Sequence, residues 1–236
     1  MRLRGVFLMA AAVLLTGCSG AAASSSATTT ASASATTEAP VQLLGSQLVP
    51  VLLPKSVMPA GYSLITSATQ DSGQAKPHDT TEQVPSGNNF CVVFASSYFL
   101  PAAGIQDSTY AQNGYRNSGD TAEVDQSIDV YTGDDAQAAM QKLWAAFGSC
   151  AKFTYTDQGT TLNSVLKRST LTGIGDQAVE AVTKSGIPGG VTLIAVRISN
   201  SIITIVDSSP SADDGTAAAL RYARQLTTRL RSAAAG

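Results

Sequence analysis

The residue types that could perform chemistry are few and widely spaced in this chain. His78 is the only histidine, so a Ser-His-Asp triad would have to use it, yet no Gly-x-Ser-x-Gly elbow surrounds any serine. The carboxylate pairs Asp134-Asp135 and Asp213-Asp214 each stand where a helix is expected to begin, and acidic residues there complement the helix dipole. Adjacent residues on a helix point in different directions. We therefore expect no catalytic residues, no metal site and no cofactor.

The glycine-containing segment Gly173-Ile174-Gly175-Asp176 has only two of the glycines that a dinucleotide-binding loop requires. A strand-like segment, residues 177–182, follows it, whereas the nucleotide-binding motif continues as a helix. The segment is therefore predicted to be a turn between strands.

Aromatic side chains could line a cleft, although packing in the core is the alternative. Trp144 falls on an apolar helical stripe, which favours the core. For the tyrosines the choice between cleft and core stays open, because a buried hydroxyl needs a hydrogen-bond partner. The remaining candidates are Tyr62, Phe94, Tyr98, Tyr110, Tyr115 and Tyr131.

The first 17 residues have the pattern of a signal peptide. Arg2 and Arg4 precede an apolar run at residues 6–15, which is too short for a hydrocarbon core that needs about 20 residues. Leu15-Thr16-Gly17-Cys18 resembles the lipobox of bacterial lipoproteins, in which the chain is cut before the cysteine and the sulfur receives a diacylglyceryl group. We expect lipidation of Cys18 and anchoring at the outer face of the cell membrane. The alternative is an ordinary cleaved signal with an incidental cysteine.

Residues 18–40 are expected to be a lipidated cysteine followed by a disordered tether. The tract after Cys18 is almost wholly Ser, Thr, Ala and Gly, and Glu38 is its only charge. Such a composition cannot bury a core, and a flexible coil of this length spans about 25 Å. Residues 41–236 are long enough to form a single domain with a real core.

The cysteine count supports one disulfide. If Cys18 carries lipid, Cys91 and Cys150 remain as an even pair in an oxidising compartment. A bridge between them would close a loop of about 60 residues and stabilise the fold by about 4 kcal/mol in the chain-entropy model. The alternative is two buried free thiols.

The charge balance argues against a nucleic-acid partner. Removing residues 1–17 takes two arginines from the 15 basic residues, and the remaining 13 face 17 acidic residues, for a net charge of −4. No Lys/Arg cluster that could bind phosphates stands out along the sequence.

Hydrophobic periodicity predicts two principal helices. Residues 134–148 carry an apolar stripe that includes Met140, Leu143 and Phe147, with Asp134 as the N-cap and Gly148 as the C-cap. Residues 212–231 form the last helix, in which Ser211 and Asp214 make a pair like a capping box. Residues 41–53 are expected to be a short helix or an irregular packed segment. Residues 88–100 have helical spacing, with a strand as the competing assignment.

The remaining segments predict strands and turns. Residues 202–206 are apolar on both faces and should form a central, covered strand, paired in a hairpin with residues 191–198. Residues 71–87 read as a polar surface loop. Consecutive strands with short turns favour an α+β fold, a mostly antiparallel β-sheet with packed helices. The other expected strands are residues 63–67, 105–116, 122–131, 152–156, 164–171 and 178–183.

Several of these features together resemble a known family. They are the helix DDAQAAMQKLWAAFGSC with Trp144 six residues before Cys150, the upstream Cys91, the turn TGIGDQA and the hairpin VRISNSIITIVD. This arrangement resembles the PknH-like extracellular domain, the outer sensor part of an actinobacterial Ser/Thr kinase, which also occurs on free-standing lipoproteins. The resemblance covers residues 45–231 and implies an α+β fold with disulfides and a cleft for an unidentified ligand. The kinase domain carries two disulfides, whereas this chain has cysteines for one.

The leading hypothesis is a membrane-anchored, extracytoplasmic binding or sensor-type domain without catalytic activity. Its ligand would be a small molecule, a lipid or a protein of the cell envelope. One alternative is a cell-envelope hydrolase, which would need two converging carboxylates in a cleft. The other is a purely structural envelope lipoprotein, which would lack a pocket.

Overall fold

The computed structural model describes residues 42–74, 87–95, 98–157, 159–185, 190–209 and 212–235. Cys18, His78, Ser211 and most of the expected loop at residues 71–87 lie outside the described residues, so the predictions made for them stay predictions. None of the described helices is both long and apolar enough to cross a membrane.

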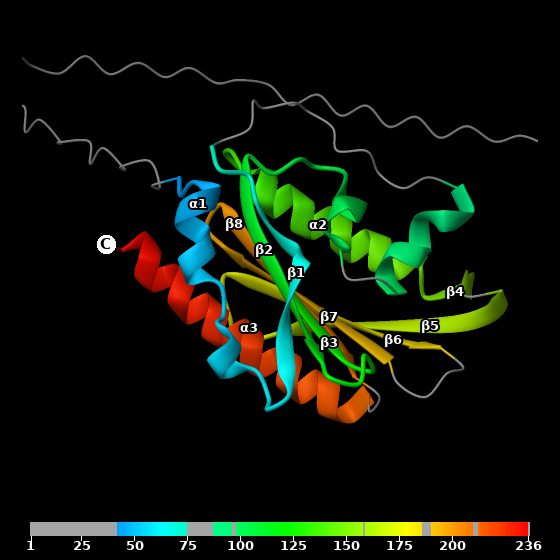
Figure 1. Ribbon diagram of the computed structural model, residues 1–236. Helices are drawn as coiled ribbons and strands as arrows, with labels where there is room; N and C mark the ends of the chain where they lie inside the picture. The colour runs from blue at the N-terminus through cyan, green and yellow to red at the C-terminus, as the bar shows by residue number, and fades with distance from the viewer. Residues whose placement is uncertain are drawn as a thin grey trace, which may run out of the picture. The chain divides into compact units, whose positions relative to one another are not determined.

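Eight strands in the described part of the chain form one antiparallel sheet in the order β1-β2-β3-β8-β7-β6-β5-β4 (Figure 1). Six of the seven neighbouring pairs consist of strands that are consecutive in the sequence. The seventh pair, β3–β8, joins β1–β3 to β4–β8. The predicted mostly antiparallel α+β fold is confirmed. The strands are β1 (Tyr62–Asp71), β2 (Thr109–Asn117), β3 (Glu123–Val130), β4 (Lys152–Asp157), β5 (Thr160–Leu171), β6 (Gln177–Ser185), β7 (Gly190–Ile198) and β8 (Ser201–Ser209).

Helical elements cover the two faces of the sheet. On one face, here called the α3 face, lie α1 (Gly45–Leu48), η1 (Val49–Val51) and α3 (Ala212–Ala234). On the other, the α2 face, lie α2 (Asp135–Ser149) and the 3₁₀ helices η3 (Gly87–Ala95) and η4 (Leu100–Ala103). A further 3₁₀ turn, η2 (Lys55–Val57), leads into β1. Figure 1 shows α2 and α3 on opposite sides of the strands.

The core of the α3 face forms where α3 crosses β7 and β8. The α3 helix buries an apolar stripe that consists of Ala219, Ala223, Leu226 and Leu230. The stripe packs on alternate residues of the sheet, Ile203 among them. Each fully buried Leu or Ile side chain contributes about 1.5–3 kcal/mol relative to exposure. β8 contributes Ile203 and Ile205 to the core of the α3 face and Ile202 and Val206 to that of the α2 face, so it is the central, covered strand that the sequence predicts.

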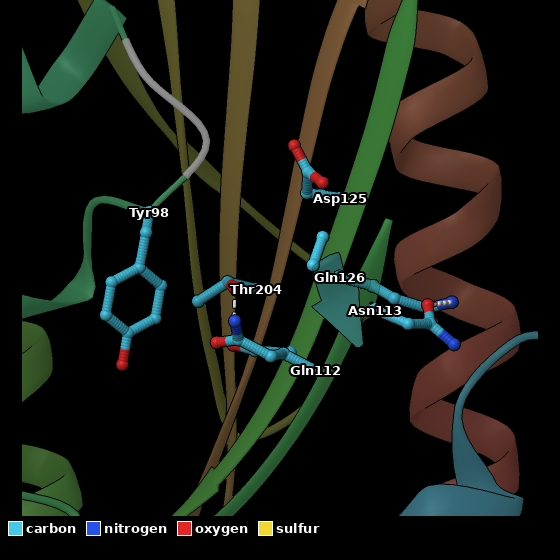
Figure 2. A pocket seen from close by; sticks show the side chains of 8 residues that line it. Tyr98, Gln112, Asn113, Asp125, Gln126 and Thr204 are labelled. Carbon is cyan, nitrogen blue, oxygen red and sulfur yellow. Dashed lines mark hydrogen bonds between the residues drawn. The ribbon is translucent and has the colours of Figure 1, made fainter. Parts of the chain in front are cut away.

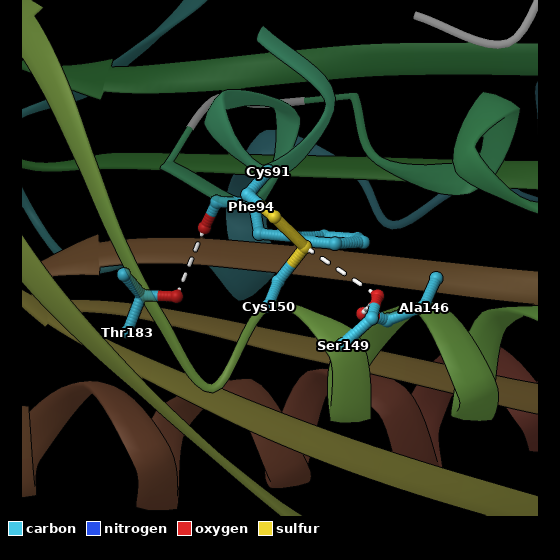
Figure 3. The surroundings of a disulfide bond; sticks show 6 residues. All are labelled: Cys91, Phe94, Ala146, Ser149, Cys150 and Thr183. Atoms are coloured by element: carbon cyan, nitrogen blue, oxygen red, sulfur yellow. Dashed lines mark hydrogen bonds between the residues drawn. A yellow bond between two sulfur atoms is a disulfide. The ribbon is translucent and has the colours of Figure 1, made fainter. Parts of the chain in front are cut away.

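The core of the α2 face is fixed by the predicted disulfide, which the structure confirms. Cys91 and Cys150 are bridged with a Cα–Cα distance of 5.5 Å, and the bond joins η3 to the end of α2 (Figure 3). Phe94 packs on Phe147 with ring centroids 4.9 Å apart. The Thr183 hydroxyl donates a hydrogen bond of 3.0 Å to the Phe94 carbonyl, so η3 is also tied to β6.

The α2 helix differs from the expectation at both ends. Asp134 occupies the N-cap position, but its side chain makes no capping hydrogen bond. The helix continues through the predicted C-cap Gly148 to Ser149, and Cys150 is the C-cap. Gly148 has another role, since a Cβ there would lie 2.6 Å from Nη1 of Arg168. The glycine therefore makes room for a guanidinium group instead of ending the helix.

Two further expectations are met in part. Trp144 packs against the core but is only partly buried, and the Arg168 guanidinium lies over its ring at 4.0 Å. The expected helical segment at residues 88–100 contains the 3₁₀ element η3 and the first residue of η4, in agreement with the favoured helical assignment over the strand. Pro101 lies in the first turn of η4, where proline is tolerated because its missing N–H would have no partner in the helix.

Candidate functional site

At the β1–β2–β3 end, the α2 face of the sheet lies beyond the reach of the α2 helix, and the segment that contains Tyr98 lies over it instead. The α2 helix packs on β5, β6 and β7, and polar side chains instead of apolar ones occupy this face of β2 and β3. A small pocket of about 50 Å³ lies here between Tyr98 and the strands (Figure 2). A cavity of this size accepts a few water molecules or one polar group of a larger ligand. The side chains that face it are Ala68, Tyr98, Gln112, Asp125, Ser127 and Thr204.

A chain of hydroxyl groups forms the floor of the pocket. Ser127 and Thr204 are directly opposite each other on β3 and β8, and their hydroxyl oxygens are 2.7 Å apart. The Ser127 hydroxyl donates to Oδ2 of Asp129 at 2.5 Å. Because Ser127 has only one proton, Thr204 must donate to Ser127 in the 2.7 Å contact. The lone pairs of Thr204 Oγ1 therefore remain able to accept a hydrogen bond from a ligand.

Asp125 forms one wall of the pocket, and Gly114 gives it space. The two residues are paired across β3 and β2, and a Cβ at Gly114 would lie 2.1 Å from Oδ1 of Asp125. The same Cβ would lie 3.4 Å from Cβ of Ala68 on β1. Glycine at this position thus lets the carboxyl group lie flat over β2, where a larger residue would displace it.

The electrostatic surroundings keep Asp125 protonated at neutral pH. Burial raises its pKa from 3.8 to about 8, and the charge of Glu123 and a hydrogen bond with Glu123 add to the shift, while Arg116 opposes it. A proton held at neutral pH makes this carboxyl uncharged. Burial thus favours the uncharged form of the Asp125 carboxyl.

Glu123 is engaged outside the pocket. Its Oε2 accepts hydrogen bonds from Nε and Nη2 of Arg116 at 2.9 and 2.7 Å. Glu123 and Asp125 are two positions apart on β3, so they share a face of the sheet. This is the carboxyl pair that a hydrolase would need, but only Asp125 lines the pocket.

The backbone beneath the pocket is held by a network on the α3 face. The Gln126 side chain accepts from the Leu53 amide at 2.9 Å and donates to the Leu53 carbonyl at 2.9 Å. It also donates to Oδ1 of Asn113 at 2.7 Å. Figure 2 shows the Asn113 and Gln126 side chains directed away from Tyr98. They fix the register of β2 and β3 and leave the opposite face to Gln112, Asp125 and Ser127.

The candidate residues considered from sequence are mostly structural where the structure describes them. Asp135 and Asp213-Asp214 lie in the first turns of α2 and α3. No group of three or more metal-ligating side chains occurs within the described ranges. Gly173 and Gly175 have φ angles of 73° and 61° in the turn between β5 and β6, which confirms the predicted turn.

The aromatic candidates divide between the core and the surface hollows. Phe94 and Tyr115 are buried, and the Tyr115 hydroxyl donates to the Leu53 carbonyl at 3.0 Å. Tyr98 lines the polar pocket. Tyr131 is buried beside a larger hollow of about 520 Å³ at the turn between β7 and β8.

The sequence analysis did not single out Asp125, Ser127 and Asp129 as a site. The available signal was their alternation on one face of β3, opposite the apolar Val124 and Ile128. Such alternation normally indicates a solvent-facing strand. Here Ser127 and Asp129 are 3% and 1% exposed, so the polar face is buried.

Comparison with known proteins gives a match of fold. No protein-family model matches the sequence, and no curated protein matches it. The solved extracellular domain of PknH from Mycobacterium tuberculosis superposes with a TM-score of 0.57 and 14% sequence identity, over 82% of this chain and 100% of that domain. This chain shares the fold of the PknH extracellular domain. The fold implied by the sequence resemblance is thereby confirmed.

Proposed function

We propose that the protein is an extracytoplasmic binding or sensor-type module without catalytic activity, anchored in the membrane by a lipid on Cys18. The extracellular setting of the PknH domain with the same fold supports the location. The lipobox-like segment and the polar tether support the anchor. The partners of the module would be the membrane and a ligand of the cell envelope, and nucleic acid would not be among them.

The observation that carries the proposal is the small polar pocket lined by Gln112, Asp125 and Thr204. Asp125 holds its proton at neutral pH, since burial raises its pKa to about 8, and Thr204 offers an acceptor. Gln112 adds an amide, which both donates and accepts. A site of this kind favours an uncharged group rich in hydrogen bonds, such as a sugar hydroxyl or an amide. A charged group would lose hydration there without gaining an opposite charge.

A ligand screen with a matched variant pair tests the proposal. Envelope glycans, peptides and lipids are screened by thermal shift, and the binding of any hit is measured by calorimetry. Thr204→Val keeps the volume but removes the acceptor, and should weaken binding about tenfold, as expected for one lost hydrogen bond. Thr228→Val, at an exposed position on α3, is the control and should leave binding unchanged. Equal affinity of the two variants would remove the pocket from the proposal.

The carboxyl pair gives a second candidate function, an envelope hydrolase. A raised pKa suits a general acid, and Asp125 is two positions from Glu123 on the same face of β3. The ligand recovered after incubation separates the two functions. Intact ligand supports the binding module, whereas cleavage that is lost in Asp125→Asn would establish the enzyme. If no compound stabilises the protein, the result would favour the alternative of a purely structural envelope lipoprotein.

A further inference from the structure

The α3 face of the sheet is open at the end opposite the polar pocket. The α3 helix packs mainly on β7 and β8, with few contacts to β6, and α1 packs on β1 and β2. In Figure 1 the ends of β5 and β6 extend beyond α3. A groove of about 510 Å³ lies along these strands, bordered by Thr216 of α3.

The register of the strands brings three lysines together in this region. In one row Val165 of β5 lies between Lys152 of β4 and Lys184 of β6. In the next row along this face, Lys167 of β5 is paired with Val182 of β6. Lysine and valine therefore alternate across β5 and β6, with diagonal neighbours about 7–8 Å apart. The result is an apolar floor with ammonium groups along its border.

This cluster is unusual for a chain of net negative charge. Three of the six lysines lie in it, although they are 15 and 17 positions apart in the sequence. The ion pairs among the described residues use arginines, and none of these three lysines pairs with a described carboxylate. The only acid lining the groove is Glu180, which accepts a hydrogen bond of 3.1 Å from Ser169 one row farther on. The lysine end of the groove is thus positive, and the Glu180 end is not.

The apolar part of the groove is also exposed to solvent. Val165 is 42% exposed, one of three large apolar side chains with that degree of exposure in the described chain. Val182 is half-buried beside it. The methylene stems of Lys167 and Lys184 extend the apolar surface, because lysine places its stem on apolar groups and its charge in water. The groove therefore combines an apolar floor of elongated shape with cations at one end.

We infer that this groove binds an anionic amphiphile, a molecule with a phosphate or carboxylate head and an apolar chain. The head interacts with Lys167 and Lys184, and the chain lies on Val165 and Val182 toward Ser169. Lys152 adds positive charge from the sheet edge. An uncharged amphiphile loses the ionic contacts, and a small inorganic anion loses the apolar contact, so neither binds as well. This site is separate from the polar pocket and does not depend on the function proposed for that pocket.

Lysine footprinting of the full chain tests the inference. The probe is monomeric dihexanoylphosphatidylglycerol, and the readout is the rate of acylation of each lysine by an amine-reactive reagent, followed by mass spectrometry. At a probe concentration of about three times its dissociation constant, acylation of Lys167 and Lys184 should slow about fourfold, because three quarters of the sites are occupied. Lys55 and Lys142, exposed on other elements, are internal controls and should react at unchanged rates.

The comparison probes separate the sources of an anionic head group. Dihexanoylphosphatidylcholine and inorganic phosphate should give no protection, and Val165→Asn should weaken the protection by the anionic lipid without altering the melting temperature. Equal rates at Lys167, Lys184, Lys55 and Lys142 in the presence of the anionic lipid would overturn the inference, as would equal protection by phosphate alone. Protection by phosphatidylglycerol vesicles but not by the monomeric lipid would also overturn it, and would assign the lysines to a membrane surface.

Discussion

Replacing Asp125 with asparagine should make the protein less sensitive to pH. Burial and the neighbouring Glu123 raise the pKa of Asp125 from 3.8 to about 8 in the folded state. Between these two values the folded protein binds the proton and the unfolded chain does not, so stability falls as the pH rises through this window. Asparagine is uncharged at every pH and has nearly the same shape, and it still fits over Gly114.

The magnitude follows from the shift in pKa. Within the window the free energy of unfolding of the wild type should fall, relative to Asp125→Asn, by at most about 1.4 kcal/mol per pH unit. Over the whole window, from 3.8 to about 8, the difference reaches at most about 6 kcal/mol. Asp207, whose pKa burial raises to about 7, adds a fall of the same sign between pH 4 and 7. It is present in both proteins, so its effect cancels in the difference.

Urea unfolding between pH 4 and pH 9 measures this difference directly. The stability of Asp125→Asn minus that of the wild type should grow steadily with pH and level off above pH 8. Asp134→Asn, which changes an exposed aspartate that makes no capping bond, is the matched control. Parallel curves for the wild type and Asp125→Asn would refute the reasoning, because they would mean that Asp125 is ionised in the folded protein at neutral pH.

Three further predictions concern the disulfide, a turn and the anchor. The double variant Cys91→Ser/Cys150→Ser should lower the free energy of unfolding by about 4 kcal/mol in urea titrations, and free thiols of this pair in the unfolded, unreduced wild type would contradict the bridge. Gly175→Ala should cost about 2 kcal/mol or more, since φ is +61° and the new Cβ would lie 2.5 Å from the Arg197 carbonyl. Gly173→Ala, with open space around it, should cost only about 1 kcal/mol. Cys18→Ala should abolish incorporation of labelled acyl groups, and retained label would exclude this cysteine as the anchor.

Local pattern was sufficient to predict most elements of the sheet and both long helices. The α3 stripe and the two-sided apolar β8 follow directly from the periods of 3.6 and 2 in their sequences. The pairing of Cys91 with Cys150 followed from the cysteine count. These predictions succeed because each depends on residues within one element or on a simple parity argument.

The features that the sequence did not predict depend on contacts with residues from distant segments of the chain. Gly148 was expected to end a helix, but Arg168, 20 positions later, occupies the space beside it. Trp144 belongs to the apolar stripe by spacing, yet its ring is only partly buried and the guanidinium of the same Arg168 lies over it. The contact between Ser127 and Thr204 spans 77 positions, and nothing in either segment specifies the β3–β8 pairing that creates it.

The two candidate sites have a common geometric origin. Strands lie about 4.8 Å apart, so eight of them make a sheet more than 30 Å wide, whereas a helix with its side chains is about 10–12 Å across. On the α3 face, α1 covers the β1 end and α3 the middle, which leaves β4–β6 open. On the α2 face, α2 covers β5–β7, which leaves β1–β3 to the Tyr98 segment. The two regions are therefore at opposite ends and on opposite faces.

The chemistry of the two regions differs because their burial differs. At the β1–β3 end the Tyr98 segment lies over the strands, so the polar groups there are desolvated and must satisfy one another, as Ser127, Thr204 and Asp129 do. At the β4–β6 end, Lys152, Lys167 and Lys184 remain in water and keep their charge available. A buried polar pocket suits a ligand that exchanges hydrogen bonds, and an open cationic groove suits one that brings charge and apolar surface. Because the two regions lie at opposite ends and on opposite faces of the sheet, ligands bound at the two proposed sites would not compete.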